Sequence, residues 1–385
     1  MPVDYDCIIA GAGFSGATAA RCLAEAGRRV LLLERRRHLG GNAYDCYDEA
    51  GVLVHPYGPH IFHTQDDAVF TFLSRFTDWR AYRHTVVAEA DGQRLPVPFN
   101  LAAIEMVFGG RAAQLKEKLA SAFGTGGRVP LSVLQGSAEQ DLRELADYVL
   151  KTIFLHYSQK QWGPHFAELD PAVMARVPVV LSYEDGYFSD KHQGMPADGY
   201  TALFERMLNH ENITVQLSTD ILDRLVLAED GKILWDGAVF PGAVVYTGAL
   251  EELFGGCYGP LPYRSLRFEH ETLETDRFQS HGVVNYTLSE AFTRITEFKH
   301  LTGQSVPGRT SILREYPQDY TDAQSTPPYY PIASERCRAL YRQYRDLALR
   351  CPRLFLAGRL AEYRYYNMDA AVARALRLAE EILAL

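Results

Sequence analysis

Residues 5–34 read YDCIIAGAGFSGATAARCLAEAGRRVLLLE. Within them, residues 5–10 and 30–33 are apolar and predict two buried strands, and the alanine-rich residues 17–27 predict the helix between them. The turn before the helix carries a GxGxxG pattern made by Gly11, Gly13 and Gly16. The first glycine permits the tight turn, the second lets the backbone approach a pyrophosphate, and the third lets helix and strand pack closely. The stretch therefore predicts a dinucleotide-binding βαβ unit rather than a merely structural glycine turn.

The segment that follows the acid at the end of this unit bears on the choice between FAD and NAD. Glu34 ends the second strand, where a carboxylate would accept hydrogen bonds from an adenosine ribose. Six residues later stands Gly40-Gly41-Asn42, and an acid followed by such a pair resembles the extended fingerprint of FAD proteins of the glutathione-reductase and amine-oxidase type. The chain would pass close to the cofactor a second time there, where a side chain would block it. A simple turn after the strand is the alternative.

The last part of the chain predicts a further cofactor contact. Residues 353–357 are typical of a strand, Gly358 and Arg359 follow, and residues 368–383 have helical apolar spacing. In the FAD superfamily that the fingerprint resembles, a late strand and the N-terminus of the last helix close around the flavin. A helix N-terminus offers free amides and a positive partial charge to an anionic, reduced isoalloxazine. The predicted cofactor domain is therefore discontinuous.

Composition excludes several other classes of protein. The chain has 385 residues and a formal net charge of −9, which does not suit a general nucleic-acid binder. Its one short basic run, residues 35–37, predicts a solvated loop rather than a phosphate-binding patch. No window approaches the roughly 18 apolar residues of a membrane helix, and the N-terminus lacks the pattern of a signal peptide. The six cysteines form no CxxC pair, so we expect a cytoplasmic protein of two or three domains without a metal site.

The middle of the chain predicts a helical insertion and a second sheet. Residues 81–99 alternate around Asp91-Gly92 and predict a hairpin, and residues 100–123 and 141–155 have helical periods. Strands of an antiparallel sheet are predicted at residues 177–180, 267–270, 283–287 and 293–298, and strands of the cofactor domain at residues 213–217, 225–227 and 243–246. The predicted class is α/β, with a discontinuous Rossmann-like FAD-binding domain over residues 1–80, 193–256 and 336–385. The predicted substrate sheet covers residues 81–99, 176–192 and 257–335, and the helical domain covers residues 100–175, with a mobile loop over residues 162–176.

Histidines and aromatic residues gather in two places where a plain core does not require them. Residues 57–64 read YGPHIFHT and follow the Gly-Gly turn closely, so their backbone should lie near the flavin. His60 and His63 could suggest a metal, but no acidic or cysteine partner is nearby and the spacing is weak without a third ligand. Polar groups beside the flavin are the favoured interpretation, and plain packing is the alternative. Tyr365 and Asn367 immediately precede the last helix, so they should lie next to the isoalloxazine.

A second group of aromatic residues and arginines suggests a nucleotide sugar. The group contains Phe154, Tyr157, Trp162, Arg176, Tyr187 and Phe188. Aromatic faces stack on a planar base, and an arginine fork matches a diphosphate. The glycine and prolines between Trp162 and Arg176 suit a loop able to move over a cleft. A core aromatic cluster with a surface arginine is the alternative, and Arg294, in a predicted strand, could be an ordinary ion-pair member.

These segments together resemble the UDP-galactopyranose mutase family of the bacterial type. The matching stretches include GAGFSGA at 11–17, GGNAYD at 40–45, VHPYGPHIFHT at 54–64, KQWG at 160–163, QGMPADGYT at 193–201, TRITEFKH at 293–300 and GRLAEYRYYNMD at 358–369. They run from the first strand to the last helix, so the resemblance covers nearly the whole chain. One departure is that many members have Leu-Asp where this chain has Tyr366-Asn367, which keeps an amide but removes a charge.

The resemblance implies interconversion of UDP-galactopyranose and UDP-galactofuranose, with FAD that must be reduced although no net redox occurs. In that chemistry the reduced flavin N5 attacks the galactose anomeric carbon and UDP leaves. The sugar ring opens to a flavin iminium adduct and recloses through the other hydroxyl. The resemblance also suggests a homodimer. Two alternatives stay open: an oxidase of the amine-oxidase type, and a binding module with a flavoprotein fold and no enzymatic activity.

Carried over position by position, the resemblance assigns roles to individual residues. The candidate catalytic residues are Arg176, Arg294, Tyr365 and His60, with both arginines on the diphosphate. The candidate substrate contacts are Phe154, Tyr157, Trp162, Arg176, Tyr187, Phe188, Asn285, Arg294, Tyr330 and Tyr365. The candidate FAD contacts are Gly11, Gly13, Phe14, Ser15, Gly16, Glu34, Arg35, Gly41, Asn42, His60, Ile61, Arg359, Tyr366, Asn367, Met368, Asp369, Ala370 and Ala371.

Overall fold

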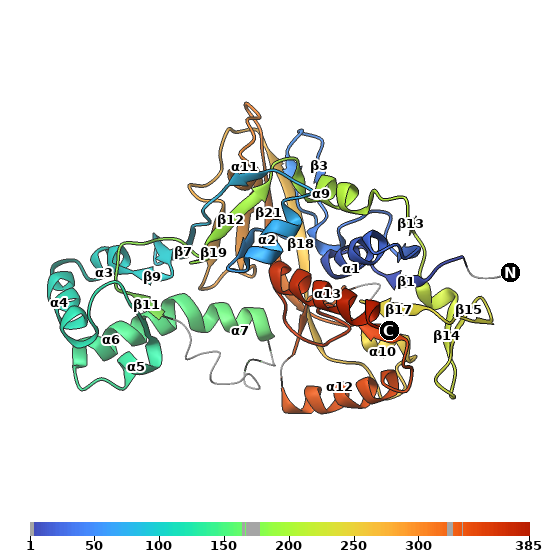
Figure 1. Cartoon of the computed structure of the whole chain (residues 1–385). Coiled ribbons are helices and arrows are strands. Elements are labelled where there is room, and N and C mark those ends of the chain that lie inside the picture. The colour runs from blue at the N-terminus through green and yellow to red at the C-terminus, as the bar shows by residue number, and fades with distance from the viewer. Residues whose placement is uncertain (1–3, 164–165, 167–177, 322–325, 333) are drawn as a thin grey trace.

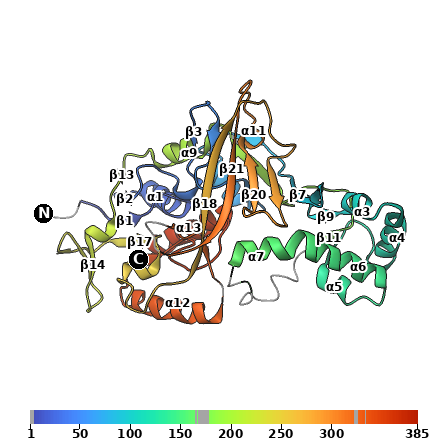
Figure 2. The ribbon, with the colours of Figure 1, turned by 180° about the vertical axis from the view of Figure 1, so that it is seen from behind.

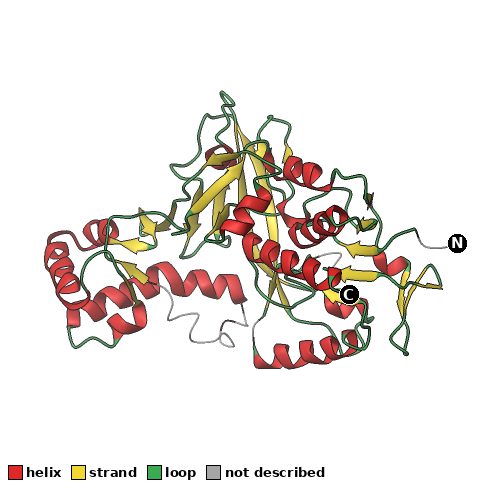
Figure 3. Ribbon diagram, in the orientation of Figure 1, coloured by secondary structure: helices red, strands yellow, loops and turns green. Residues whose placement is uncertain are grey.

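The structure is a computed structural model, and it describes residues 4–163, 166, 178–321, 326–332 and 334–385 (Figure 1). Its parts lie in a row: a parallel sheet near both chain ends, a larger sheet in the middle and the helical insertion at the far end (Figures 1 and 2). Helices dominate the insertion, whereas the other two parts are built around strands (Figure 3). Arg176 and most of the predicted mobile loop, residues 162–176, lie outside the described residues.

A five-stranded parallel sheet contains the two strands that flank the glycine motif. Its strands are β1 (Cys7–Ala10), β2 (Val30–Glu34), β13 (Ile213–Leu217), β17 (Ala243–Tyr246) and β23 (Leu354–Leu356). Their order is β13–β2–β1–β17–β23, with parallel neighbours throughout. Along β1, Cys7 and Ile9 join one apolar cluster, whereas Ile8 and Ala10 join another. A strand buried on both faces needs a continuous apolar run, and the predicted strands of this unit are confirmed.

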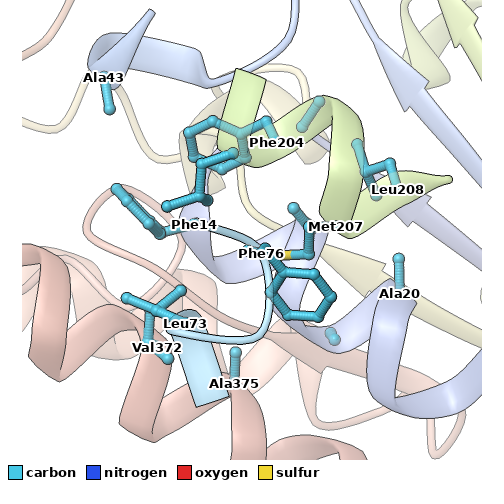
Figure 4. Packing of buried hydrophobic residues seen from close by; sticks show 14 of the residues in the cluster. Phe14, Ala20, Ala43, Leu73, Phe76, Phe204, Met207, Leu208, Val372 and Ala375 are labelled. Carbon is cyan, nitrogen blue, oxygen red and sulfur yellow. The ribbon is translucent and has the colours of Figure 1, made fainter. Parts of the chain in front are cut away.

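Helices pack on one face of this sheet, and they come from both ends of the chain and from its middle. They are α1 (Phe14–Glu25), α2 (Asp67–Leu73), α9 (Gly199–Leu208) and α13 (Met368–Leu383). Phe14 and Phe204 lie with ring centroids 4.8 Å apart, in a cluster that also contains Val372 (Figure 4). The helix α1 begins three residues before the predicted helix, directly after Gly13, whereas α13 has the predicted bounds. The opposite face of the sheet packs against α12 (Glu335–Ala348).

The larger sheet has seven strands. In spatial order they are β22 (Tyr330–Pro331), β18 (Tyr263–Leu273), β21 (Thr310–Asp319), β20 (Arg294–Glu297), β19 (Val283–Tyr286), β7 (Val86–Ala90) and β8 (Gln93–Val97). Neighbours run antiparallel, except that β19 and β7 are parallel. The predicted hairpin is confirmed as β7 and β8. Asp91 and Gly92 both have positive φ, 52° and 74°, as a type I′ turn requires.

Two predicted strands belong to other sheets, so their placement was wrong. The strand β11 (Pro178–Val180) pairs with β10 (Arg128–Pro130) and β9 (Phe99–Asn100), within the insertion and not in the larger sheet. The strand β14 (Leu225–Leu227) pairs with β15 (Ile233–Trp235), which pairs with β16 (Ala238–Val239), and it does not join the parallel sheet. For β14 the reason is local: a neighbour a few residues away closes a short loop at little entropic cost.

The helical insertion has its own apolar core and reaches the larger sheet through one helix. Its helices are α3 (Leu101–Phe108), α4 (Ala112–Phe123), α5 (Leu131–Gln135), α6 (Gln140–Val149) and α7 (His156–Trp162). The helical stretch predicted over residues 100–123 is divided into α3 and α4 at Gly109, which has φ 49°. A π-helical segment, Leu150–Leu155, continues α6 into α7, which extends toward the larger sheet (Figure 1). The remaining elements are α10 (Leu250–Leu253), α11 (Phe298–Thr302), the sheet of β5 (Phe62–Thr64), β12 (His192–Pro196) and β6 (Trp79–Ala81), and the pair β3 (Cys46–Tyr47) and β4 (Leu53–Val54).

Candidate functional site

A cavity of about 560 Å³ opens beside the carboxyl ends of β1 and β2. Its wall contains the glycine turn after β1 and the second glycine pair, Gly40 and Gly41. On the other side it contains Gly358, Arg359 and the N-terminus of α13. Open α/β sheets bind ligands outside the carboxyl ends of their strands, so this cavity is where the fold places a dinucleotide.

The glycine turn has the shape that a dinucleotide needs. Gly11 has φ +99°, and a Cβ there would lie 2.1 Å from Thr247 Oγ1. A Cβ on Gly16 would lie 1.9 Å from the Gly11 carbonyl oxygen, so α1 could not pack against the turn. Gly13 differs, because a Cβ there would touch protein atoms only at ordinary distance, the nearest being Gly41 Cα at 3.8 Å. The turn therefore leaves open space beside Gly13, where a pyrophosphate would approach the backbone.

Glu34 lines the cavity and also holds the glycine turn in place. Its Oε2 accepts a hydrogen bond from the Ala12 amide at 2.8 Å, and its Oε1 accepts one from the Arg36 amide at 2.9 Å. The side chain is buried. The carboxylate thus couples the end of β2 to the turn after β1, in addition to the ribose contact that the sequence predicts.

The basic run after β2 takes part in the cavity, so the prediction of a solvated loop is wrong for Arg36. This guanidinium donates two hydrogen bonds of 3.0 Å to Asn42 Oδ1 and lies 4.3 Å from the centroid of the Tyr57 ring. Arg35 also lines the cavity and forms an ion pair of 2.9 Å with Glu252. Sequence spacing alone could not reveal the Arg35–Glu252 ion pair, because Glu252 lies far from Arg35 along the chain.

The N-terminus of α13 faces the same cavity. Asn367 is its N-cap residue, and its side chain makes no capping hydrogen bond. Arg359 orders the preceding segment by donating to the carbonyls of Tyr366 at 2.7 Å and Tyr329 at 3.0 Å. A sixteen-residue helix carries a positive partial charge at this end, which suits an anionic group. The glycine turn and this helix end together fit the FAD that the sequence predicts.

A second cavity of about 260 Å³ adjoins the first. The two cavities share wall residues, namely Asn42, Tyr57, His60, Arg359, Asn367 and Met368. The smaller cavity is bounded on its other side by strands of the larger sheet. Groups bound in the two cavities would therefore meet at this shared wall.

Three polar residues form a row across the larger sheet in the smaller cavity. Asn285 is the register partner of Arg294, and Arg294 is the register partner of Glu315. Arg294 Nε lies 3.1 Å from Glu315 Oε1, and the Glu315 side chain is 2% exposed. Asn285 Oδ1 is buried without a hydrogen-bond partner among the described residues. Buried polar atoms are normally paired, so the row points to a polar ligand.

The charge of this row is set by burial and by the ion pair. Burial opposes the charged form of Arg294, but the Glu315 carboxylate and the phenols of Tyr157, Tyr330 and Tyr187 together outweigh burial and raise the pKa of Arg294 well above its usual value. Burial raises the pKa of Glu315, and Arg294 opposes that change. A guanidinium held charged in a desolvated cavity attracts a diphosphate more strongly than one in water.

Tyrosines surround the arginine. Burial raises the pKa of Tyr330 to about 12 and also raises the pKa of Tyr157 and Tyr187, so all three phenols are neutral donors. Tyr330 and Tyr365 are stacked, with ring centroids 5.9 Å apart. Trp162 lies beside Tyr330, and the centroids of their two rings are 6.3 Å apart.

His60 is a neutral imidazole at the wall that the cavities share. Burial, with His55 nearby, lowers the pKa of His60 to about 3. Its Nδ1 lies 2.9 Å from the Gly58 carbonyl oxygen, so Nδ1 carries the proton and Nε2 is an acceptor. His55 supports it by accepting a hydrogen bond from the His60 amide at 3.1 Å.

The structure separates the predicted site residues into groups. Predicted FAD contacts that line the larger cavity are Gly11, Gly13, Phe14, Ser15, Gly16, Glu34, Arg35, Gly41, Asn42, His60, Arg359, Tyr366, Asn367, Met368 and Ala371. Ile61 lines only the smaller cavity, and Asp369 and Ala370 line neither, since the Asp369 carboxylate accepts a hydrogen bond from Thr64 Oγ1 instead. Predicted substrate contacts that line the smaller cavity are Tyr157, Tyr187, Phe188, Asn285, Arg294, Tyr330 and Tyr365. Phe154, on the π-helical segment, and Trp162 are not part of its wall, and Arg176 lies outside the described residues.

Several wall residues were not predicted. They include His84 and Glu315. Glu315 could have been found only from strand register, because nothing in the sequence near it marks a site. His84 lies directly before β7, and only the parallel pairing of β7 with β19 brings it close to Arg294.

Two buried histidines make stability depend on pH. Burial lowers the pKa of His55 to about 4 and, with Arg294, that of His84 to about 3. Because the unfolded chain protonates first as the pH falls below about 6.5, each histidine should remove about 2 kcal/mol of unfolding free energy between pH 7 and pH 5. We expect the melting temperature to fall over this range, and His55→Gln to show a shallower slope. His156→Gln, at an exposed position, is the matched control, and equal slopes in both variants would contradict the assignment.

The described residues contain neither a metal-binding cluster nor a membrane-spanning helix. No group of three or more His, Cys, Asp or Glu residues there is placed to hold a metal ion. No helix in that part of the chain is long and apolar enough to cross a lipid bilayer.

Comparisons with known proteins agree with this geometry. A family model described as UDP-galactopyranose mutase matches residues 152–365, and one described as an NAD(P)-binding Rossmann-like domain matches residues 9–76. The chain is 35% identical to the UDP-galactopyranose mutase of Mycoplasma genitalium over 98% of this chain and 95% of that protein. The chain belongs to the UDP-galactopyranose mutase family.

Membership of this family identifies the class of reaction more firmly than the substrate. A dTDP-fucopyranose mutase of Escherichia coli is 34% identical over 97% of each chain. The family placement therefore makes the protein a nucleotide-sugar pyranose–furanose mutase, an isomerase, and the family and fold imply FAD. A crystal structure of reduced UDP-galactopyranose mutase shares the fold, with a TM-score of 0.73 at 16% identity, covering 99% of this chain and 94% of that chain.

Proposed function

We propose that the protein interconverts UDP-galactopyranose and UDP-galactofuranose, with FAD in the larger cavity, in its reduced form during turnover. The observation that carries the proposal is that the two cavities adjoin at His60, Arg359 and Asn367. A dinucleotide in one cavity and a nucleotide sugar in the other would meet at these residues. The smaller cavity supplies what a diphosphate and a sugar need, namely a buried cation and neutral hydrogen-bond donors.

The residues of the larger cavity would bind the cofactor and orient it. The glycine turn and the N-terminus of α13 would hold its anionic groups, and Glu34 would bind the ribose while it positions the turn. When bound and reduced, the flavin supplies a nucleophilic nitrogen for the anomeric carbon of the sugar. Neutral His60 would present an acceptor at the shared wall without adding charge.

The residues of the smaller cavity would bind the nucleotide sugar. Arg294 would hold the diphosphate and stabilise the negative charge that grows on it as it leaves the sugar. We propose Arg176, outside the described residues, as a second arginine on the diphosphate. Tyr157, Tyr187 and Tyr330 would donate hydrogen bonds to the nucleotide sugar and exclude water from it.

The proposal is tested by an anaerobic assay with UDP-galactofuranose, following UDP-galactopyranose by chromatography with and without dithionite. Conversion only in the reduced sample is the expected result. No conversion in either sample, from a yellow protein, would overturn the assignment and direct attention to oxygen uptake with candidate amine donors. A colourless protein would overturn the cofactor assignment.

A dTDP-linked 6-deoxy sugar is the second candidate substrate, because the fucopyranose mutase is about as similar to this chain as the galactopyranose mutase is. The same assay run with dTDP-fucopyranose separates the two, and we expect the larger kcat/KM for the UDP sugar. We further propose a homodimer that acts in the cytoplasm, where nucleotide sugars are made; light scattering of the purified holoprotein measures its oligomeric state.

A further inference from the structure

Lys160 is unusual because its ammonium group donates hydrogen bonds to three backbone carbonyls. Its Nζ donates to the carbonyl oxygens of Tyr286 at 2.6 Å, Glu290 at 2.9 Å and Phe292 at 3.1 Å. An ammonium has three protons to donate, so none is left for a ligand. Lys160 therefore contributes to a site only through what it holds in place.

One of the three carbonyls is at the end of β19, and the other two belong to the connection between β19 and β20. Asn285 immediately precedes Tyr286, and Arg294 begins β20 just after Phe292. Asn285 and Arg294 are register partners, and both line the smaller cavity. The lysine thus fixes the strand ends that carry two polar residues of the cavity.

Lys160 itself lies on α7, which also carries Tyr157, another wall residue of the same cavity. The end of α7 is held from a second direction by Arg264 of β18, which donates to the Gln161 carbonyl at 2.9 Å and the Lys160 carbonyl at 3.3 Å. The Arg264 side chain is 4% exposed. Two cations therefore attach α7, the last helix of the insertion among the described residues, to the larger sheet.

We propose that Lys160 is a positioning residue that sets the width of the smaller cavity, by holding α7 and Tyr157 at a fixed distance from the β19–β20 connection and Arg294. The inference rests on the proposed function only for the identity of the ligand, a nucleoside diphosphate. Without the ammonium, three carbonyls lose a charged donor, and the connection between β19 and β20 loses its attachment to α7.

The test uses FAD-loaded Lys160→Met, with Lys151→Met as the matched control. Lys151 lies in the same insertion and is exposed, so its replacement removes an equal charge without touching the cavity. Amide hydrogen exchange of residues 286–293 should be about tenfold faster in Lys160→Met than in Lys151→Met. UDP affinity, measured by calorimetry, should be about tenfold weaker, with KM raised more than kcat is lowered and FAD content unchanged.

Each outcome has a defined meaning. Unchanged exchange of residues 286–293 together with unchanged UDP affinity in Lys160→Met would overturn the proposal. If the wild-type protein binds no UDP and converts no substrate, the proposed function fails, and the exchange measurement still decides whether Lys160 holds the connection. If Lys160→Met does not fold, Lys160→Arg takes its place, because its planar fork keeps the charge but cannot match three carbonyls around one nitrogen. Exchange as slow as in Lys151→Met would then contradict the proposal.

Discussion

Arg294→Ala is expected to lower kcat/KM about 10²- to 10³-fold while the purified protein stays yellow. Arg294 lines the smaller cavity and not the larger one, so its loss should spare FAD. The variant removes the cation that we propose for diphosphate binding, and it leaves the buried Glu315 carboxylate without its partner. Steady-state kinetics with reduced enzyme, calorimetry with UDP and the flavin absorbance measure the three quantities.

A matched control exists on the neighbouring strand. Arg314 lies next to Glu315 on β21, pairs with Glu271 and points to the opposite face of the sheet. Arg314→Ala should keep near-normal kcat/KM. Adding Glu315→Gln to Arg294→Ala should recover part of the UDP affinity, because it removes the unpaired carboxylate. Near-normal turnover in Arg294→Ala would refute the role assigned to this arginine.

Gly13→Ala is expected to weaken FAD binding about 10- to 100-fold without changing the stability of the apoprotein. The backbone of Gly13 has φ −80°, which any residue adopts, and a Cβ there would meet protein atoms only at 3.8 Å or beyond. The methyl group would therefore occupy space that only the ligand uses. Fluorescence titration of the apoprotein with FAD measures the affinity, and thermal unfolding of the apoprotein measures the stability.

Alanine substitutions at two other glycines serve as controls for the Gly13→Ala measurement. Gly127→Ala, with no atom within 4 Å of the added Cβ, should change neither quantity. Gly16→Ala should fail to fold, because its Cβ would lie 1.9 Å from the Gly11 carbonyl oxygen. Wild-type FAD affinity in Gly13→Ala would show that the pyrophosphate does not lie against this turn.

The elements that could be predicted from the sequence are those whose causes are local. The βαβ unit follows from two apolar runs around a glycine turn, and the structure places them as β1, α1 and β2. The apolar spacing of residues 368–383 predicts α13 with its observed bounds. Asp91 and Gly92 predict the β7–β8 hairpin, because both must adopt positive φ. In each case the preference is encoded within a few residues.

Strand partners over long sequence distances could not be predicted in this way. The strand predicted at residues 177–180 was assigned to the wrong sheet, since an apolar run does not specify its neighbour. Residues 225–227 were also assigned to the wrong sheet, although their partner β15 is close in the sequence. The same limit hid Glu315, which reaches the cavity because β21 lies beside β20. It also hid the attachment of α7 by Lys160, which depends on carbonyls more than 100 residues away.

Short stretches of sequence were enough to predict a dinucleotide-binding, Rossmann-like unit, because glycine spacing, apolar period and helix position act over short stretches. The motifs of the sequence also indicated the family. Only the tertiary structure decided that the two cavities share a wall and that Arg294 faces Glu315. Only it showed that one lysine joins the insertion to the larger sheet. Those features arise from strand register and from packing between distant segments. Both depend on interactions across the whole fold and not on any single stretch of sequence.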